Sequence, residues 1–423
     1  MIKLLIIADD FTGALDTGVQ FAKKGIPTFV GVNQELDLEF IDKKIQVLAI
    51  DIESRHIQPD QAFKRVEKIV KKAKAYGIEY IYKKTDSTLR GNIGSELTAL
   101  VKAAGSQELM FIPAFPNNNR VTIDGYHYVN EIPLDQTIFA QDPFEPVKHS
   151  YIPDIIKEQT QINVVVTNYK NFEFIDSDNE KVDTIYIFDA KDNSDLKEIG
   201  IVLKRKDKLK VMAGCAGFAE ILSELLELEA KNIHFKKNSI GTLVISGSIN
   251  EVSINQMNYA QKHGYESITL TPEQKLQEDY LDTHEGEKLL ERIVERISIN
   301  EDFIIKAVEN RDQMHETDEY ANKLNIAMNK VHLKIAENMG RLVKKILDKK
   351  HVGTLVVFGG DTVLGIMKAI KCYGIIPREE VVSGVVVSDV ISDDYKLNII
   401  TKAGGFGNED ILIQIKNYLK KGE

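Results

Sequence analysis

The chain has 423 residues, of which 43% are hydrophobic and 28% charged, and its formal net charge at pH 7 is −10. This length predicts two or three domains, and the composition is typical of a soluble globular protein. A net acidic chain is a poor candidate for binding nucleic acid, and its apolar runs are too short to cross a membrane.

In the first half of the chain, short β-branched runs alternate with amphipathic stretches, which is typical of α/β layers. These runs predict strands at residues 2–8, 27–32, 45–50, 78–83, 108–112, 162–167, 184–189 and 209–213. Helices are predicted at 58–76 and 93–104, where apolar side chains recur with helical spacing. Residues 113–150 predict a long irregular loop, and loops of this length are usually functional or disordered.

The periodicity is lost near residues 229–240, and a new strand is predicted from Gly241. The alternation then resumes, with strands at 241–246, 265–270, 302–307, 352–358 and 396–401 and helices at 251–263, 284–298, 318–349, 362–371 and 409–420. The sequence therefore predicts an α/β fold of two domains, 1–235 and 236–423. Each is expected to be a mostly parallel sheet flanked by helices.

The first predicted strand ends in two adjacent acids, Asp9 and Asp10. Ligands bind at the carboxyl ends of strands in open α/β sheets, but a phosphate site there would use glycine, because carboxylates repel phosphate. One alternative is that Asp10 or Thr12 only caps a helix beginning at Gly13. Two acids are more than a cap needs, so we predict that Asp9 binds a ligand.

Two further strand ends carry polar groups of complementary charge. Arg55 follows the predicted strand 45–50, either as a salt-bridge partner or as a clamp for a substrate carboxylate. The segment KKTDSTLR, residues 83–90, collects cations, hydroxyls and a carboxylate after the strand 78–83. Together the three strand ends predict a small ligand with hydroxyl groups and a negative charge. Aspartates would accept hydrogen bonds from its hydroxyls, while Arg and Lys would hold its acid end.

The second half carries glycine-rich turns, each placed between an apolar strand and a helix. They are SGSIN (246–250), FGGDT (358–362) and KAGGFGNED (402–410). Glycine lets backbone amides approach phosphate oxygens, and a helix N-terminus favours negative charge. Three such turns in one domain predict a nucleotide-phosphate site. Neither a Walker A motif nor GxGxxG occurs, which argues against P-loop and Rossmann enzymes.

Other candidate groups carry weaker signals. Two histidines, His127 and His149, fall in the long loop and are considered as substrate contacts. The two cysteines, Cys215 and Cys372, have no CxxC spacing and are expected to be buried free thiols rather than a nucleophile or a metal site. Because the chain enters a strand directly, without the pattern of a signal peptide, we expect a cytoplasmic protein.

At these motifs the chain resembles the four-carbon acid sugar kinase family, whose members join an N-terminal sugar-acid-binding domain to a C-terminal nucleotide-binding domain. The matching stretches span almost the whole chain in the expected order: IIADDFTGALDTG, DIESRH, KKTDSTLRGN, PAFPNNNRVTIDGYHYVN, ISGS, FGGDT and KAGGFGN. The chain has Ala403 and Ile52 where members often have serine and threonine. The resemblance implies ATP-dependent phosphorylation of threonate, erythronate or 3-oxo-tetronate.

The resemblance also implies roles for individual residues. The implied substrate contacts are Asp9, Arg55, Lys84, Thr85, Asp86 and Ser87. The implied ATP contacts are Ser246, Gly359, Gly360, Asp361, Thr362, Gly404, Gly405, Phe406 and Gly407. The carboxylate that orients the attacking hydroxyl or accepts its proton is left open among Asp361, Asp86 and Asp9.

These observations lead us to expect a kinase that uses ATP and Mg²⁺ and phosphorylates the terminal hydroxyl of a small sugar acid in a cleft between its domains. The Mg²⁺ ligands are not identified. A non-catalytic sugar-acid sensor is the alternative, although a sensor has no need of phosphate-binding turns. A second alternative is an NAD-dependent dehydrogenase, but the chain lacks the GxGxxG fingerprint of that class of enzyme. We expect no nucleic-acid or membrane partner, and a homodimer is left open.

Overall fold

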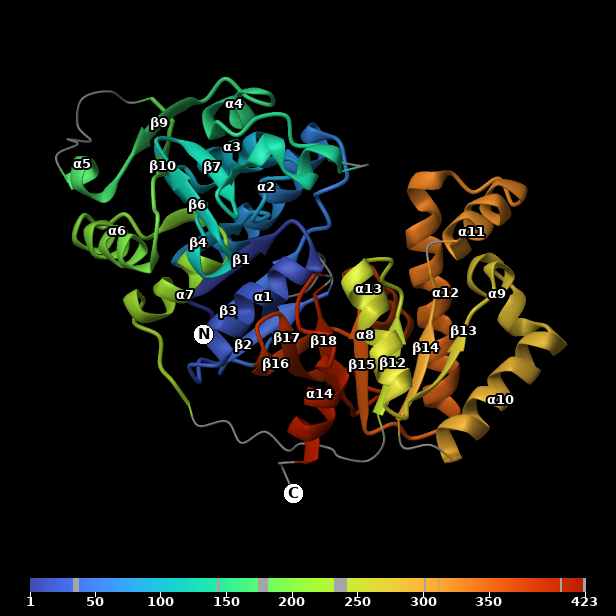
Figure 1. Ribbon diagram of the computed structural model, residues 1–423. Coiled ribbons are helices and arrows are strands. Elements are labelled where there is room, and N and C mark those ends of the chain that lie inside the picture. The colour runs from blue at the N-terminus through green and yellow to red at the C-terminus, as the bar shows by residue number, and fades with distance from the viewer. Residues whose placement is uncertain are drawn as a thin grey trace. The chain divides into compact units, whose positions relative to one another are not determined.

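The computed structural model spans residues 1–423 and describes residues 1–32, 38–142, 145–173, 182–231, 242–299, 302–310, 312–403 and 405–420. The chain divides into two compact units, Met1–Asn232 and Ile233–Glu423 (Figure 1). Residues 232–241, where the sequence places the start of the second domain, and Gly404 lie outside the described residues.

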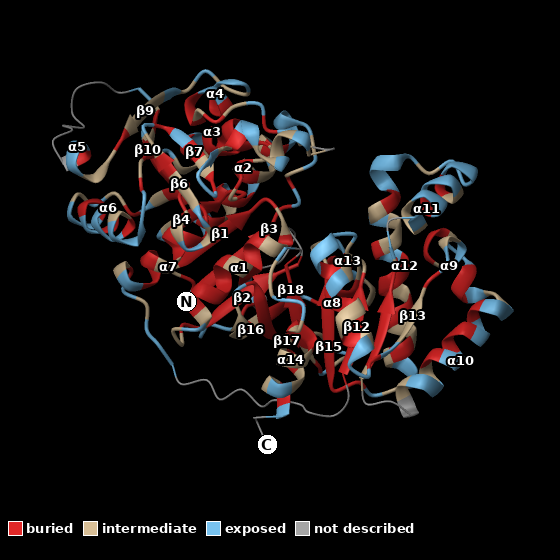
Figure 2. Cartoon of the chain, in the orientation of Figure 1, coloured by how far each residue is buried: buried red, intermediate tan, exposed pale blue. Residues whose placement is uncertain are grey.

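The N-terminal unit is built on a wholly parallel sheet with the strand order β2-β3-β1-β4-β11-β5-β10-β9. Its strands are β1 (Leu4–Ala8), β2 (Thr28–Gly31), β3 (Val47–Asp51), β4 (Tyr80–Lys84), β5 (Glu108–Ile112), β9 (Asn163–Thr167), β10 (Thr184–Phe188) and β11 (Val211–Gly214). The central strands are buried along their whole length (Figure 2). Continuous Val/Ile/Leu-rich runs produce such strands because helices cover both faces of a parallel sheet.

The helices of this unit are α1 (Phe11–Ala22), α2 (Pro59–Ala75), α3 (Ile93–Ala104), α4 (Ile152–Lys157), α5 (Tyr169–Glu173), α6 (Asn193–Arg205) and α7 (Ala216–Leu225). Local sequence fixes several of their ends. Pro59 starts α2, where its missing N–H is not needed, and Gly105 ends α3 in the left-handed conformation with φ 65°. The predicted helices 58–76 and 93–104 are therefore confirmed within a residue or two.

Residues 113–150 were expected to be irregular, and the structure corrects this. They form a three-stranded antiparallel sheet of β6 (Arg120–Ile123), β7 (Tyr126–Val129) and β8 (Ile132–Pro133). All three strands are very short. Asp124 and Gly125, both at positive φ, join β6 to β7, so the sequence carried a turn signal but the apolar runs were too brief to predict strands. The unit also contains the 3₁₀ turns Leu38–Phe40, Pro116–Asn118, Leu134–Gln136 and Ile138–Gln141.

The C-terminal unit has the strand order β13-β14-β12-β15-β18-β17-β16. Its strands are β12 (Thr242–Ser246), β13 (Glu266–Thr269), β14 (Asp302–Lys306), β15 (Thr354–Phe358), β16 (Gly374–Val382), β17 (Val385–Ile391) and β18 (Asn398–Lys402). The first five in this order are parallel, and β17 and β16 continue the sheet as antiparallel strands. Both units are thus mostly parallel α/β sheets, which confirms the predicted fold class.

The helices of the C-terminal unit are α8 (Glu251–Lys262), α9 (Pro272–Leu276), α10 (His284–Ile299), α11 (Asp312–Lys323), α12 (Met328–Lys349), α13 (Gly360–Ala369) and α14 (Ile411–Lys420), with a 3₁₀ turn at Tyr280–Asp282. The single helix predicted at 318–349 is wrong, because the chain breaks between α11 and α12, where Asn325 takes a left-handed conformation with φ 57°. The strands β16 and β17 were not predicted from the sequence. In β16, Pro377 lies at a break in register and most side chains are only partly buried, so its pattern is weak.

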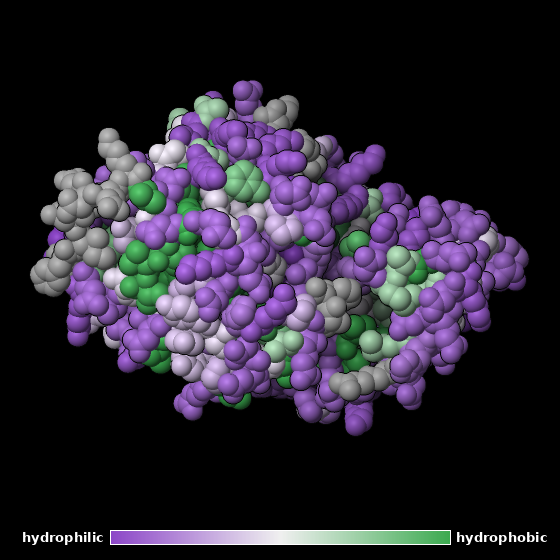
Figure 3. All heavy atoms as spheres, turned by 90° about the horizontal axis from the view of Figure 1, so that it is seen from above, coloured by the Kyte–Doolittle hydropathy of each residue, from purple (hydrophilic) through white to green (hydrophobic). Residues whose placement is uncertain are grey.

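Surface features agree with the composition. The face shown in Figure 3 carries mainly hydrophilic side chains. Among the helices that the structure describes, none combines the length and the hydrophobicity needed to cross a membrane. Both Cys215 and Cys372 are buried free thiols, as predicted.

Candidate active site

The carboxyl ends of four neighbouring strands, β3, β1, β4 and β11, meet at one edge of the N-terminal sheet. Ala8, the last residue of β1, pairs with Asp51 of β3 and with Lys84 of β4, and Lys84 pairs with Gly214 of β11. The polar residues that follow these strand ends must therefore lie together, as the sequence predicted. We call Asp9, Asp10, Arg55, Lys84 and Asp86 the strand-end cluster.

Arg55 is the centre of the strand-end cluster. Its Nε donates to Asp9 Oδ2 at 2.7 Å, and its Nη1 lies 2.8 Å from Asp10 Oδ2. Its Nη2 lies 3.6 Å from Asp86 Oδ1. Burial alone would lower the pKa of the guanidinium, but these three carboxylates outweigh it and raise the pKa well above its usual value. Arg55 therefore joins all three strand-end acids, which is the salt-bridge alternative considered for it.

The two adjacent acids have different tasks. Asp10 is the N-cap of α1, since its Oδ1 accepts a hydrogen bond from Gly13 N at 2.8 Å. The cap alternative is thus confirmed for Asp10, although the helix begins at Phe11 rather than at Gly13. Asp9 caps nothing: it is 3% exposed, and its Oδ1 has no hydrogen-bond partner among the described residues.

The charge on Asp9 is stabilised by its surroundings. Burial alone would raise the pKa of this carboxyl, but the positive charges of Arg55, Lys83 and Lys84 outweigh burial and lower the pKa below its ordinary value. Asp9 is therefore a carboxylate at neutral pH. A buried carboxylate oxygen without a partner is costly, so Oδ1 is available for a hydroxyl donor of a ligand.

The two lysines at the end of β4 point to opposite sides, as alternation in a strand requires. Lys83 is fully buried and pairs with Glu96 of α3 at 2.9 Å, and Glu96 also accepts a hydrogen bond from Ser54. Lys84 donates from Nζ to the carbonyl oxygen of Thr85 at 2.9 Å. Burial would lower the pKa of Lys84, but the carboxylate of Asp9 raises it above its ordinary value. Of the two, Lys84 is the cation of the strand-end cluster.

The segment that follows Lys84 is held from two sides. Asp86 accepts hydrogen bonds from Arg90 Nε at 2.8 Å and Arg90 Nη2 at 3.1 Å, and Arg90 also reaches Asp142 at 3.0 Å. Burial alone would raise the pKa of Asp86, but Arg55 and Arg90 hold it well below its usual range. Such a carboxylate is a poor proton acceptor, which weakens Asp86 as a candidate base.

Of the two histidines considered from the sequence, His127 supports the segment that follows β4. His127 of β7 is fully buried, and its Nε2 lies 3.0 Å from the carbonyl oxygen of Ser87. This contact helps to position the backbone of residues 85–88. His149 instead bonds Glu158 at 3.1 Å. Burial raises the pKa of the Cys215 thiol to about 11, which agrees with a packing role. Arg90 belongs to the segment 83–90 that the sequence placed at this site, whereas the contact of His127 with Ser87 could not be predicted, because it depends on how residues 113–150 fold.

In the C-terminal unit, the neighbouring strands β14, β12, β15 and β18 also end at one sheet edge. Ser246 pairs with Lys306 and with Phe358, and Phe358 pairs with Lys402. Gly359 follows Phe358 with φ 104°, a conformation that favours glycine, and is the N-cap of α13. Gly360, Asp361 and Thr362 are therefore the first turn of α13, where backbone amides are free of helical partners and suit an anion.

Close packing fixes the turn after β12 against this helix. A Cβ added to Gly247 would lie 2.1 Å from Oγ1 of the buried Thr362. Thr362 thus supports the adjoining turn from within, whereas Asp361 is exposed. The structure brings Ser246, Gly359, Gly360, Asp361 and Thr362 together, as predicted.

The last glycine turn is held by one side chain. Nε2 of the buried Gln256 in α8 donates to the carbonyl oxygens of Phe406, Gly407 and Asn408 at 2.9–3.0 Å. Gly405 is exposed, and a Cβ added to it would meet no heavy atom within 4 Å. The turn therefore offers Gly405 as open backbone, while the predicted contact Gly404 lies outside the described residues.

Lys402, at the end of β18, is a functional candidate that the sequence analysis did not select. It is 2% exposed, donates to Ser253 Oγ at 3.0 Å, and lies 5.1 Å from the ring centre of Phe358. Burial lowers the pKa of its ammonium group to about 8. An amine so placed at a strand end between glycine turns fits the charge of a phosphate group.

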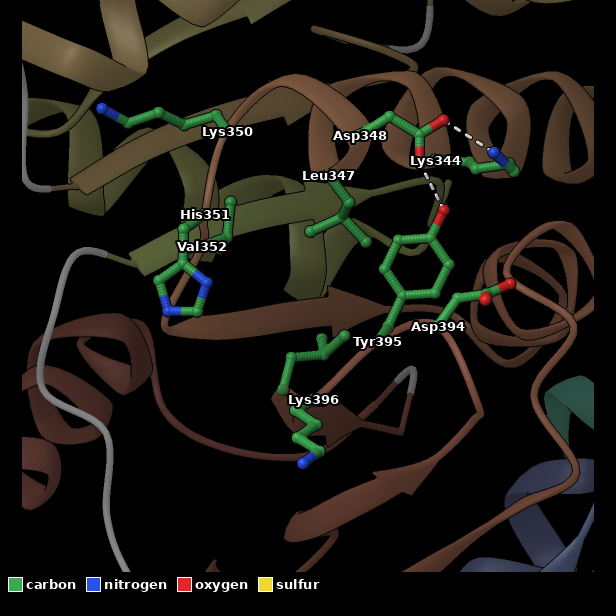
Figure 4. A pocket seen from close by; sticks show the side chains of 10 residues that line it. Lys344, Leu347, Asp348, Lys350, His351, Val352, Asp394, Tyr395 and Lys396 are labelled. Atoms are coloured by element: carbon green, nitrogen blue, oxygen red, sulfur yellow. Dashed lines mark hydrogen bonds and ion pairs between the residues drawn. The ribbon is translucent and has the colours of Figure 1, made fainter.

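A hollow elsewhere in this unit is not part of the site. It has a volume of about 450 Å³ and is lined by Val352 and Leu397, which precede β15 and β18 at the amino ends of the strands. In it Asp348 is already engaged by Lys344 at 2.6 Å and by the hydroxyl of Tyr395 (Figure 4). Ligands of parallel sheets bind at the opposite, carboxyl ends.

Comparison with known proteins gives a family match for each half of the chain. A sugar-binding N-terminal domain model matches residues 4–222, and a nucleotide-binding C-terminal domain model matches residues 243–412. The chain is 27% identical over 430 residues to the D-threonate kinase of Salmonella typhimurium, with 99% of each chain covered. The chain belongs to the four-carbon acid sugar kinase family. The resemblance noted from the motifs is thereby confirmed.

Other curated kinases are similar to this chain over all or part of its length. The D-erythronate kinase of Heliobacterium modesticaldum is 27% identical over 433 residues, with 99% of this chain and 97% of the relative covered. The 3-oxo-tetronate kinase of Escherichia coli is 31% identical over 177 residues, or 41% of this chain and 45% of the relative. A solved chain described as a putative tRNA synthase from Salmonella typhimurium has the same fold, with a TM-score of 0.81 at 20% identity and coverage of 99% and 100%.

Proposed function

We propose that this protein transfers the γ-phosphoryl group of ATP to the terminal hydroxyl of a four-carbon sugar acid, namely threonate, erythronate or 3-oxo-tetronate. The observation that carries the proposal is the full-length similarity to curated threonate and erythronate kinases, which includes both units. The polar groups of the two strand-end sites suit the two substrates of this reaction. One site offers acids and cations to a sugar acid, and the other offers glycine amides and a buried lysine to phosphate.

In the N-terminal unit, Asp9 would accept a hydrogen bond from a substrate hydroxyl through its unpaired Oδ1, and Lys84 would supply positive charge beside it. Thr85, Asp86 and Ser87 line the same strand end, so their proposed substrate contacts remain compatible with their positions. Asp86 is a poor base because Arg55 and Arg90 hold its charge. We favour Asp9 as the group that orients the attacking hydroxyl, because its buried Oδ1 has no hydrogen-bond partner among the described residues.

In the C-terminal unit, the first turn of α13 and the open backbone at Gly405 would contact the phosphates of ATP, with Lys402 balancing their charge. Phosphoryl transfer needs mainly positioning and charge neutralisation, so these groups suffice in outline. In the described ranges, no three His, Cys, Asp or Glu side chains gather as metal ligands. When Mg²⁺ is bound with ATP, the phosphate oxygens would supply most of its ligands, and the exposed Asp361 at the start of α13 would supply one from the protein.

The alternative of a non-catalytic sugar-acid sensor is disfavoured. Its pocket would occupy only the first unit, whereas the second unit matches a nucleotide-binding domain. The curated relatives that match over the full length are kinases.

The proposal is tested by measuring ATP-dependent turnover of a panel of both enantiomers of threonate and erythronate, together with 3-oxo-tetronate. Formation of the phosphorylated acid should be followed directly, because ADP release alone would also report hydrolysis. We expect one acid to be phosphorylated with a kcat/KM at least tenfold above the others. Binding of an acid without phosphorylation in the presence of ATP and Mg²⁺ would favour the sensor.

Two further expectations accompany this proposal. A homodimer stays a prediction, which light scattering of the purified protein would test. A cytoplasmic location likewise stays a prediction, which fractionation of cells would test.

A further inference from the structure

The guanidinium of Arg55, predicted as a clamp for the substrate carboxylate, is already occupied. Its three nitrogens face Asp9, Asp10 and Asp86 at 2.7, 2.8 and 3.6 Å. A substrate carboxylate placed against Arg55 would displace one of these acids and lie beside the other two. Like charges at such distances repel, so a different cation must receive the acid end of the substrate.

Arg120, the first residue of β6, is a cation with an unsatisfied donor. Its Nη1 donates to the carbonyl oxygen of Asn118. Its Nε is buried and has no hydrogen-bond partner among the described residues. Buried N–H donors are rarely left unpaired, because the lost hydrogen bond to water is not replaced. The unpaired Nε–H of Arg120 therefore indicates that a hydrogen-bond acceptor of a ligand binds beside it.

The fold directs Arg120 towards the strand-end cluster. Residues two apart in a strand share a face, so Arg120 lies on the same face of β6 as Thr122. Thr122 Oγ1 lies 3.2 Å from His127 Nδ1, and the opposite nitrogen of His127 lies 3.0 Å from the carbonyl oxygen of Ser87. This face of β6 therefore faces the segment that follows β4, where Asp86 lies.

Electrostatics agree with this placement. Burial lowers the pKa of Arg120, and the carboxylate of Asp86 gives the largest opposing effect. Asp86 is shared with Arg90 and Arg55, so it does not neutralise a third guanidinium. The positive charge on Arg120 is thus under-compensated in the protein alone.

We propose that Arg120, and not Arg55, binds the carboxylate of the sugar acid. The inference deepens the proposed function and rests on it, because it assumes that the ligand is an acid. Arg120 would offer the substrate Nε and one Nη, the paired geometry that a carboxylate fits. The hydroxyl groups would then extend towards the unpaired Oδ1 of Asp9. Arg120 is in this reading the residue that selects acids over neutral sugars.

The test compares an acid with its own neutral amide, which keeps the stereochemistry and length but lacks the charge. Binding of both to the full-length protein is measured by calorimetry without ATP. Wild type should bind the acid at least tenfold more tightly than the amide. In Arg120→Gln the acid should bind tenfold to a hundredfold more weakly, the amide should be almost unchanged, and the preference should disappear. In Arg120→Lys the charge survives but the fork does not, so an intermediate preference is expected.

A matched control is Arg296→Gln, an exposed arginine in the other unit that pairs with Glu266 at 3.0 Å. It should leave both affinities unchanged. Equal weakening of acid and amide in Arg120→Gln would make the residue structural and overturn the inference, as would a wild type without any preference for the acid. Should Arg120→Gln fail to fold by circular dichroism, Arg120→Lys supplies the same comparison.

The same measurement separates the two proposals. If wild type binds the acid with the Arg120-dependent preference but forms no phosphorylated product, the kinase function fails and the assignment of Arg120 stands. If product forms and the preference for the acid is unaffected by either Arg120 variant, the kinase function stands and the assignment fails.

Discussion

His127 donates from Nε2 to the carbonyl oxygen of Ser87, 3.0 Å away, while its Nδ1 faces Thr122 Oγ1 at 3.2 Å. A carbonyl oxygen only accepts, so the ring carries its proton on Nε2 and Nδ1 accepts from the threonine hydroxyl. Burial lowers the pKa of His127 to about 4, so the neutral form is the folded form at physiological pH. The β6–β7 hairpin thereby supports the backbone of the predicted substrate segment.

The depressed pKa of His127 predicts a pH dependence of stability. Unfolded histidine has a pKa of about 6.5, so between pH 6.5 and 4 the unfolded chain binds a proton that the folded chain does not. The contribution is fully present above pH 6.5 and is lost as pH falls towards 4, up to about 3 kcal/mol. We expect Tm to fall more steeply with acidification in wild type than in His127→Gln. Parallel Tm curves for the two proteins over this range would contradict the assignment.

Asp9 and Asp10 should respond differently to mutation. Asp9→Asn is nearly isosteric and should fold, but it weakens a charge-assisted hydrogen bond to substrate. Such bonds are worth about 1.5–3 kcal/mol, so kcat/KM for the acid should fall roughly tenfold to a hundredfold, with the KM for ATP unchanged. Steady-state kinetics with both substrates check this. Full activity in the folded variant would remove Asp9 from the site.

Asp10→Ala provides the contrasting case. It removes the N-cap of α1, at a cost of about 0.5–2 kcal/mol, and also the ion pair with Arg55. Asp10→Asn loses the same ion pair but keeps a capping oxygen, so Tm should fall further in Asp10→Ala than in Asp10→Asn. Thermal melts of the two variants measure the cap separately from catalysis. An unchanged Tm in Asp10→Ala would show that the hydrogen bond to Gly13 contributes little.

The sequence predicted the strand ends well because their apolar runs and register place Asp9, Arg55 and Lys84 together whatever the details of packing. It predicted a ligand role for Asp9 but left the helix cap open between Asp10 and Thr12, since the cap depends on which way each side chain turns. Lys402 escaped selection because a lysine is ordinarily exposed, and only tertiary packing buries it. Arg120 was missed, and His127 was considered only as a substrate contact, for a related reason: they lie in the short strands β6 and β7, whose pairing is not visible in local periodicity.

Two glycines of the C-terminal unit separate a folding effect from a ligand effect. A Cβ added to the exposed Gly405 would meet no heavy atom within 4 Å outside its chain neighbours, so we expect Gly405→Val to keep its Tm. If the turn contacts phosphate, the added side chain should weaken ATP binding at least tenfold. Calorimetry with ATP and Mg²⁺ measures the affinity. Unchanged ATP affinity would mean that Gly405 lies away from the phosphates.

Gly247→Ala should behave in the opposite way. Its Cβ would lie 2.1 Å from Oγ1 of the buried Thr362, so the substitution forces the first turn of α13 to move. We expect a lower Tm together with weaker ATP binding, because the damage begins in the protein. A normal Tm in this variant would show that the turn after β12 is less tightly packed than the structure indicates.

Lys402 predicts how ATP affinity depends on pH. Burial lowers its pKa to about 8 in the absence of ligand, and a phosphate beside it favours the protonated form. Below pH 8 the ammonium group is already charged, so ATP affinity should be nearly constant. Above pH 8, Lys402 of the ATP-free protein is mostly neutral, so ATP binding requires that the lysine take up a proton. The affinity for ATP should therefore fall, by up to about tenfold per pH unit, as the pH rises above 8.

Lys402→Met removes the titrating group, so it is the control for the predicted pH dependence of ATP affinity. The substitution replaces a buried charge with an apolar chain of similar length, so the fold should survive and Tm should hold or rise. ATP should bind more weakly at pH 7, by roughly tenfold or more, and the loss of affinity between pH 8 and 9.5 should disappear. Calorimetric titrations of both proteins across this range decide the matter. If the wild-type affinity is flat through pH 8, or if the variant retains the wild-type pH dependence, Lys402 does not face the phosphates and another cation must neutralise them.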